Sequence, residues 1–184
     1  PWVWKPILNL ILIRRPFSSG DAYKELWNIE ENESPLLTIT KAQTKKLRAR
    51  VNTAYGDKVL VDFCMRYGNP STESVLKKMV SQGCTKILFF PLYPQYAAPT
   101  TATANDQMFR SLMKLNWQPS IRTVPPYFDS SDFIKAISKS ITTAYEKSKF
   151  KPQHLVISYH GVPERYLING CLLYTSDAAD DDTR

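Results

Sequence analysis

Cysteine and long apolar runs are scarce in this sequence of 184 residues. The three cysteines, Cys64, Cys84 and Cys171, are odd in number and lack metal-ligand spacing, so neither a disulfide framework nor a zinc site is indicated. A reducing, cytoplasmic location fits them best. The longest apolar run, residues 7–13, is interrupted by Asn9 and is far shorter than the ~20 residues that span a bilayer. With no leader of basic, apolar and small residues at its start, the chain is expected to be soluble.

Glycine-rich and nucleophile motifs are also missing. No G-x-G-x-x-G or Walker sequence occurs among the six glycines, so nucleotide binding is disfavoured and no nucleotide cofactor is expected. The G-x-S-x-G turn of α/β-hydrolases is absent too, which leaves a Ser-His-Asp hydrolase weakly supported.

Charge is distributed unevenly along the chain. The whole sequence carries a formal +7, but residues 171–184 hold four aspartates and one arginine, so residues 1–170 carry +10. The acidic end lacks apolar periodicity and is expected to be disordered. The basic residues of the body are spread over several predicted helices without interleaved aromatic residues, which argues against nucleic acid as a partner.

Short apolar runs alternate with amphipathic stretches along the body of the chain. Three continuous β-branched and aromatic runs are typical of parallel strands covered on both faces: residues 58–64, 86–93 and 154–159. A further strand is expected within residues 121–128, ended by its prolines. Helices are expected over residues 41–54, 102–115 and 132–145, and from Asn69 as N-cap to Gly83. This alternation predicts an α/β fold, a doubly wound parallel sheet of the Rossmann-like, three-layer kind.

Three unusual sequences follow predicted strands, at the edge where open parallel sheets bind ligands. They are MRYGNPS (residues 65–71), YPQYAAPTTAT (residues 93–103) and HGVPERY (residues 160–166). Each has an ordinary explanation in turn formation or helix capping. Together they would bring a cation, several tyrosines, hydroxyl groups and an imidazole to one edge, which suits a flat, partly anionic ligand.

His160 is one of only two histidines and directly follows the predicted strand 154–159. A histidine at a strand end can be a packing or capping residue, or it can bind a ligand or take up a proton. The residues alone leave both open.

The ordered motifs resemble those of the ferrochelatases, enzymes that insert ferrous iron into a porphyrin to make haem. The segments that carry the resemblance, in chain order, are PILNLILIRRP, AYKELW, ESPLLTITKAQTKKL, MRYGNPS, ILFFPLYPQYAAPTTAT, VPPYF and ISYHGVPERY. The resemblance implies a chelatase fold of two similar α/β domains. Residues 1–170 would hold most of the first domain and the start of the crossover to the second, and residues 171–184 would be a foreign or disordered tail.

The resemblance also implies the site residues. His160 would be the catalytic and iron-site residue, and Fe²⁺ would be the substrate metal. Neutral imidazole can accept a pyrrole proton or bind Fe²⁺, and both roles stay open. Six residues are expected to contact the porphyrin and its propionates: Arg15, Arg66, Tyr67, Tyr96, Thr100 and Thr101. An iron–sulfur cluster, the oligomeric state and the choice between protoporphyrin and coproporphyrin are left open.

Two family features fall outside the sequence, namely the opening strand and a second half with a glutamate opposite the histidine. The chain is therefore expected to be an inactive fragment by itself. Two other functions stay open, a chelatase for cobalt or another metal and a non-catalytic module that binds porphyrin or anionic lipid. Apolar residues near the start would form either a lip with peripheral membrane contact or part of the core: Trp2, Trp4, Ile7, Leu8 and Leu10.

Overall fold

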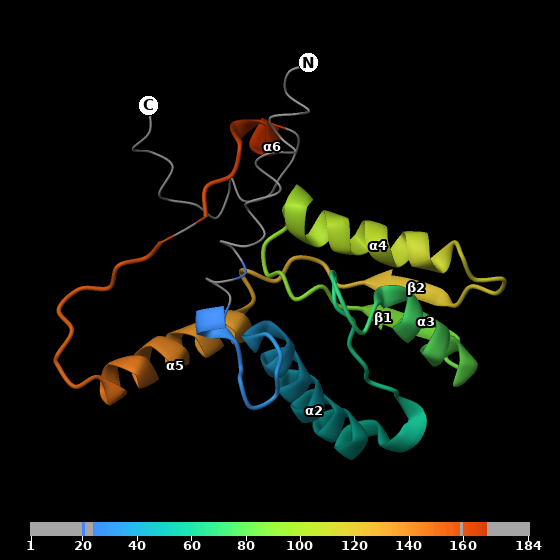
Figure 1. The fold of residues 1–184 in the computed structure, drawn as a ribbon, viewed down its shortest axis with the longest axis horizontal. Helices are drawn as coiled ribbons and strands as arrows, with labels where there is room; N and C mark the ends of the chain where they lie inside the picture. Colours follow the sequence, from blue (N-terminus) through green and yellow to red (C-terminus); the bar gives the residue numbers. More distant parts are fainter. Residues whose placement is uncertain (1–19, 21–23, 159, 169–184) are drawn as a thin grey trace. The chain divides into compact units, whose positions relative to one another are not determined.

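The computed structural model describes residues 20, 24–158 and 160–168 (Figure 1). The chain divides into two compact units, Pro1–Ser71 and Thr72–Arg184, which are taken in turn. Arg15, the N-terminal apolar residues and the tail 171–184 lie outside the described residues. Among the helices that are described, none is both long and apolar enough to cross a membrane.

The first unit contains one long helix, α2 (Pro35–Tyr55). Ser34 caps it, because its hydroxyl accepts the Leu37 N–H at 3.2 Å, and a proline at the first helical position is already in helical conformation. The helix ends at Gly56, whose φ of 59° suits a residue without a side chain. A 3-10 turn, Gly56–Lys58, follows. The helix expected over residues 41–54 is confirmed, with a start six residues earlier.

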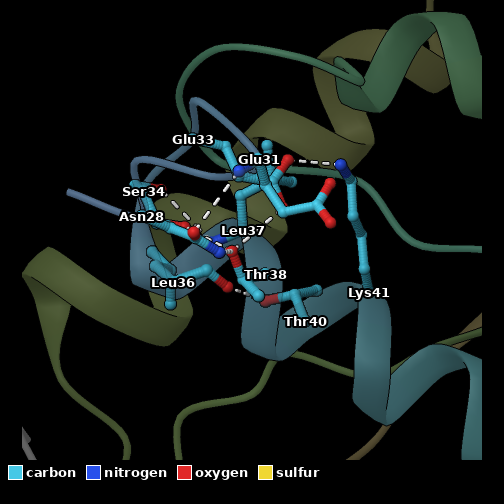
Figure 2. A network of polar contacts seen from close by, with 9 residues as sticks. All are labelled: Asn28, Glu31, Glu33, Ser34, Leu36, Leu37, Thr38, Thr40 and Lys41. Atoms are coloured by element: carbon cyan, nitrogen blue, oxygen red, sulfur yellow. Dashed lines mark hydrogen bonds and ion pairs between the residues drawn. The ribbon is translucent and has the colours of Figure 1, made fainter.

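A polar network fixes the start of α2 (Figure 2). Asn28 and Glu33 exchange main-chain hydrogen bonds of 3.0 and 3.2 Å, which closes a tight turn before the cap. The Glu33 carboxylate accepts the Thr38 hydroxyl at 3.0 Å and pairs with the ammonium of Lys41, one turn further along. The hydrogen bond from Lys41 lowers the pKa of Glu33, so this nearly buried carboxylate is charged near neutral pH.

The strand predicted at residues 58–64 is wrong: residues 59–64 form no strand, although Val59 has extended backbone angles. A strand needs a neighbour to hydrogen-bond with, and the described part of this unit provides none. Instead, the Val61 carbonyl accepts two N–H groups of Arg48, from Nε at 3.2 Å and Nη2 at 2.9 Å. A helix side chain thus satisfies a carbonyl that a sheet would otherwise satisfy.

The second unit is built on a two-stranded parallel sheet, β1 (Lys86–Phe89) and β2 (Ser120–Thr123), paired from Lys86↔Ser120 to Phe89↔Thr123. Helix α4 (Thr103–Leu112) connects the strands, and α3 (Thr72–Ser81) precedes them (Figure 1). The core lies where these elements meet, at Leu76, Ile87 and Met108. The predicted α/β fold with a parallel sheet is confirmed.

Most expected element boundaries in this unit hold to within a turn. Helix α3 begins at Thr72, after a cis Asn69–Pro70 peptide, so Asn69 is not its cap. The helix expected over residues 132–145 is α5 (Ser131–Lys147), but the side chains of Ile134 and Ile137 are about half exposed. A short helix, α6 (Glu164–Ile168), ends the described part.

The strand predicted at residues 154–159 is also wrong over its described residues, 154–158. The three apolar side chains expected to be covered on both faces are exposed: Leu155, Val156 and Ile157. The run has the composition of a buried strand, but pairing and cover must come from other parts of a chain.

Candidate functional site

The loop after β1 carries three of the predicted porphyrin contacts, namely Tyr96, Thr100 and Thr101. The chain leaves the sheet at Phe89, passes Pro94 and Tyr96, and forms a π-helical turn, Ala98–Ala102, that leads directly into α4. The extended Ala97 residue precedes this turn, and its carbonyl accepts the N–H groups of Thr100 at 3.1 Å and Ala102 at 3.3 Å. The loop is therefore an ordered structure at the carboxyl end of β1.

The two threonines differ in exposure. Thr101 is 4% exposed and donates its hydroxyl to the Gln95 carbonyl at 3.3 Å. Thr100 is only partly buried and donates its hydroxyl to the Ala97 carbonyl at 3.2 Å. Thr101 thus shapes the loop from inside, and its contact with a porphyrin stays a prediction.

Arg66 and Tyr67 lie in the first unit, in a turn closed by the Met65 N–H, which donates to the Pro70 carbonyl at 2.8 Å. Gly68 allows the turn, with φ of 84°. The Arg66 guanidinium carbon lies 4.6 Å from the centroid of the Tyr67 ring, a cation–π contact. The ring itself is 77% exposed. The pair presents an aromatic face and a cation together.

The Nε–H of Arg66 is the notable feature of this turn. The nitrogen is buried and has no hydrogen-bond acceptor among the described residues. A buried donor without an acceptor costs about 1–3 kcal/mol, more when the group is charged. Arginine suits carboxylates because its planar fork can donate two parallel hydrogen bonds. The turn is therefore suited to bind an anion.

His160 lies in the second unit, four residues before α6, and is exposed. Its Nδ1 is 2.7 Å from the carbonyl oxygen of Gly161. A carbonyl oxygen can only accept, so Nδ1 is the donor in this hydrogen bond, and in the neutral ring the lone pair is then on Nε2. The imidazole is thereby prepared to accept a proton or to bind a metal through Nε2.

The structure brings together some of the predicted residues. Tyr96, Thr100 and Thr101 share one loop, and Arg66 lies against Tyr67. Within the described ranges, no three His, Cys, Asp or Glu residues cluster in a way that could hold a metal ion. Arg15 lies outside the described residues.

Sequence reasoning missed one residue near the site. Tyr127 follows β2, and its main-chain N–H donates to the carbonyl of Pro94 in the loop at 2.9 Å. A contact between segments so far apart in the sequence leaves no local signal.

Comparison with known proteins identifies the family. The family model described as ferrochelatase matches residues 1–179. The chain belongs to the ferrochelatase family. It is 56% identical over 167 residues to the ferrochelatase of Rhodobacter capsulatus, a match that covers 90% of this chain and 48% of that protein. The ferrochelatase of Mesorhizobium japonicum is 52% identical over 171 residues, with 91% and 47% covered.

The ferrochelatase of Bradyrhizobium diazoefficiens is more distant, 46% identical over 169 residues, with 91% of this chain and 48% of that protein covered. The chain thus spans about half the length of the curated relatives it matches. The resemblance drawn from the ordered motifs is confirmed.

Proposed function

We propose that this chain forms the porphyrin-binding part of a ferrochelatase, a lyase that inserts Fe²⁺ into protoporphyrin or coproporphyrin to form haem. Membership of the family supports the reaction. The buried, unsatisfied Nε–H of Arg66 carries the proposal for the ligand, because a porphyrin propionate would supply the missing acceptor. The exposed Tyr67 ring beside it provides an apolar face for the macrocycle.

His160 is proposed to act on the metal or on the pyrrole protons. Two N–H protons leave the porphyrin as a divalent ion enters, so the reaction needs a base with a pKa near neutral, or a ligand that holds the ion beside the ring. The exposed imidazole with its proton on Nδ1 has Nε2 free for either role. Imidazole is also a suitable ligand for Fe²⁺.

We extend the proposal to location and surroundings. The three cysteines of the sequence, which are odd in number and lack metal-ligand spacing, support a reducing, cytoplasmic compartment. The apolar residues of the N-terminal segment are proposed to contact a membrane surface or the porphyrin itself, as an alternative to packing in a core.

The test is a chimera in which the parts of the Rhodobacter capsulatus ferrochelatase that this chain does not match are joined to residues 1–168. Anaerobic insertion of Fe²⁺ into protoporphyrin and into coproporphyrin is followed by absorbance. We expect His160→Ala to lower the insertion rate by about 10²-fold or more, the usual contribution of a positioned acid or base, with porphyrin binding retained. Arg66→Ala should weaken porphyrin binding about tenfold or more, and Arg66→Lys should restore only part of it.

His154→Ala is the matched control, since His154 is the other histidine and is also exposed. Equal rates for the His154→Ala and His160→Ala chimeras would contradict the assignment of His160. Porphyrin binding without any metallation would favour a non-catalytic binding module, and faster insertion of Co²⁺ than of Fe²⁺ would favour a cobalt chelatase.

A further inference from the structure

Three aromatic side chains form a chain of edge-to-face contacts next to the loop after β1. The rings of Phe90 and Tyr127 have centroids 5.1 Å apart at an interplanar angle of 83°. Those of Tyr127 and Phe133 lie 5.5 Å apart at 89°. Edge-to-face pairs of this geometry contribute beyond the area that they bury. Tyr127 is the middle ring, so its position is defined from two sides.

The rings come from both sides of the parallel strand pair, with Phe90 far from the other two in the sequence. Phe90 directly follows β1, Tyr127 lies beyond β2, and Phe133 is in the first turn of α5. Because β1 and β2 are parallel, the segments that follow the two strands leave the sheet at the same edge (Figure 1). Tyr127 is partly buried there, and this burial raises the pKa of its phenol.

The main chain of Tyr127 connects this aromatic group to the loop. Its N–H donates to the Pro94 carbonyl at 2.9 Å, and its own carbonyl accepts the N–H of Ser130, the N-cap residue of α5, at 3.1 Å. Just before it, the Val124 N–H donates to the Phe89 carbonyl at 2.9 Å, continuing the sheet contact. One of these hydrogen bonds ends at the Phe89 carbonyl and the other at the Pro94 carbonyl. Together they hold residues 89–94, the segment that leaves β1, at both of its ends.

The remainder of the loop is held by its own hydrogen bonds. The Gln95 carbonyl accepts the hydroxyl of buried Thr101, and the Ala97 carbonyl accepts main-chain N–H groups of the π-helical turn. These bonds fix the loop internally. Tyr127 links the loop to the segment after β2 and to the N-cap of α5 through its two main-chain hydrogen bonds.

We propose that Tyr127 is a positioning residue, which holds residues 94–102 in the conformation that presents Tyr96 and Thr100 to the porphyrin. The proposal rests on the proposed function of that loop. The ring of Tyr127 fixes the position of its main-chain N–H, and the N–H fixes Pro94, two residues before Tyr96. Tyr127 does not itself touch the reacting atoms.

The experiment measures amide hydrogen exchange and porphyrin binding in the full 184-residue chain. Tyr127→Ala keeps the main-chain N–H but removes the ring, so exchange at the Thr100 and Ala102 amides should rise at least about tenfold. Exchange in the paired strands β1 and β2 should stay unchanged. Protoporphyrin affinity, followed by quenching of porphyrin fluorescence, should fall in parallel.

Rescue and control variants separate this role from general destabilisation. Tyr127→Phe keeps both ring contacts and should restore slow exchange and porphyrin affinity. Phe133→Ala, outside the loop, removes one of the two contacts and should give a smaller change of the same sign. Tyr145→Ala, a half-exposed tyrosine near the end of α5, should change neither quantity.

The outcomes distinguish the two proposals. Unchanged exchange in the loop of Tyr127→Ala, or an equal rise throughout β1 and β2, would overturn the positioning role. Faster loop exchange with rescue by Tyr127→Phe would support it. If the loop responds in this way but the unaltered chain and all variants bind porphyrin equally, the porphyrin function assigned to this loop is wrong while the link between Tyr127 and the loop stands.

Discussion

Truncating Leu76 to alanine should remove about 3 kcal/mol from the free energy of unfolding. The side chain is 2% exposed and lies in the core cluster with Ile87 and Met108. Losing about three methylene equivalents at ~0.8 kcal/mol each gives roughly 2.4 kcal/mol, and the cavity left behind adds to it. The flexible side chains of Met79 and Met108 can fill part of that cavity, which keeps the total below the upper limit of about 5 kcal/mol.

Urea denaturation followed by far-UV circular dichroism measures this loss. With a urea dependence of about 1–3 kcal/mol per molar, the midpoint should fall by roughly 1–3 M. Leu88→Ala is the control, because Leu88 is a leucine of the same unit, in β1 beside the core residue Ile87, but its side chain is 66% exposed. Its cost should be below about 1 kcal/mol. Equal midpoints for the two variants would refute the view that the α3–β1–α4 core stabilises the unit.

Two further predictions concern single polar side chains. Ser34→Ala removes the N-cap of α2 and should cost about 1 kcal/mol, whereas Ser34→Gly should cost only a few tenths; thermal unfolding that ranks them the other way would contradict the capping role. The ammonium groups of Lys114 and Lys77, at 2.7 and 2.8 Å, lower the pKa of Glu73 from 4.5 to about 2. As the pH falls, the unfolded chain takes up this proton before the folded chain does, so the stabilisation is present above pH 4.5 and is lost as the pH falls toward 2. Glu73→Gln should be less stable at pH 7, and its melting temperature should decline less over that interval. An unchanged decline would contradict the ion pairs.

Local signals in the sequence predicted the helices better than the strands. Helices depend on spacing and caps within one segment, so α4 and α5 were found close to their observed bounds. The earlier start of α2 has a local signal of its own, since Ser34 followed by proline is a typical N-cap and first helical residue. Of the four apolar runs, those at residues 86–93 and 121–128 are the ones with strands in the part of the chain that the structure describes, because these two lie side by side and pair. The runs at 58–64 and 154–159 have strand composition without a described partner, and composition alone cannot provide one.

The candidate site was predictable to the extent that it is local. The segment at residues 65–71 pointed to Arg66 and Tyr67 by residue type, and the structure adds a buried Nε–H without a described acceptor, which no sequence pattern reveals. In the loop, two adjacent threonines look alike in sequence, but Thr101 is buried and donates its hydroxyl to the Gln95 carbonyl, while Thr100 stays partly exposed. The contact between Tyr127 and Pro94 requires β1 and β2 to be parallel neighbours before it can exist. A residue that acts through its main chain on a distant loop can be substituted without altering any local motif, so such residues are found from the pairing of the strands and not from the sequence around them.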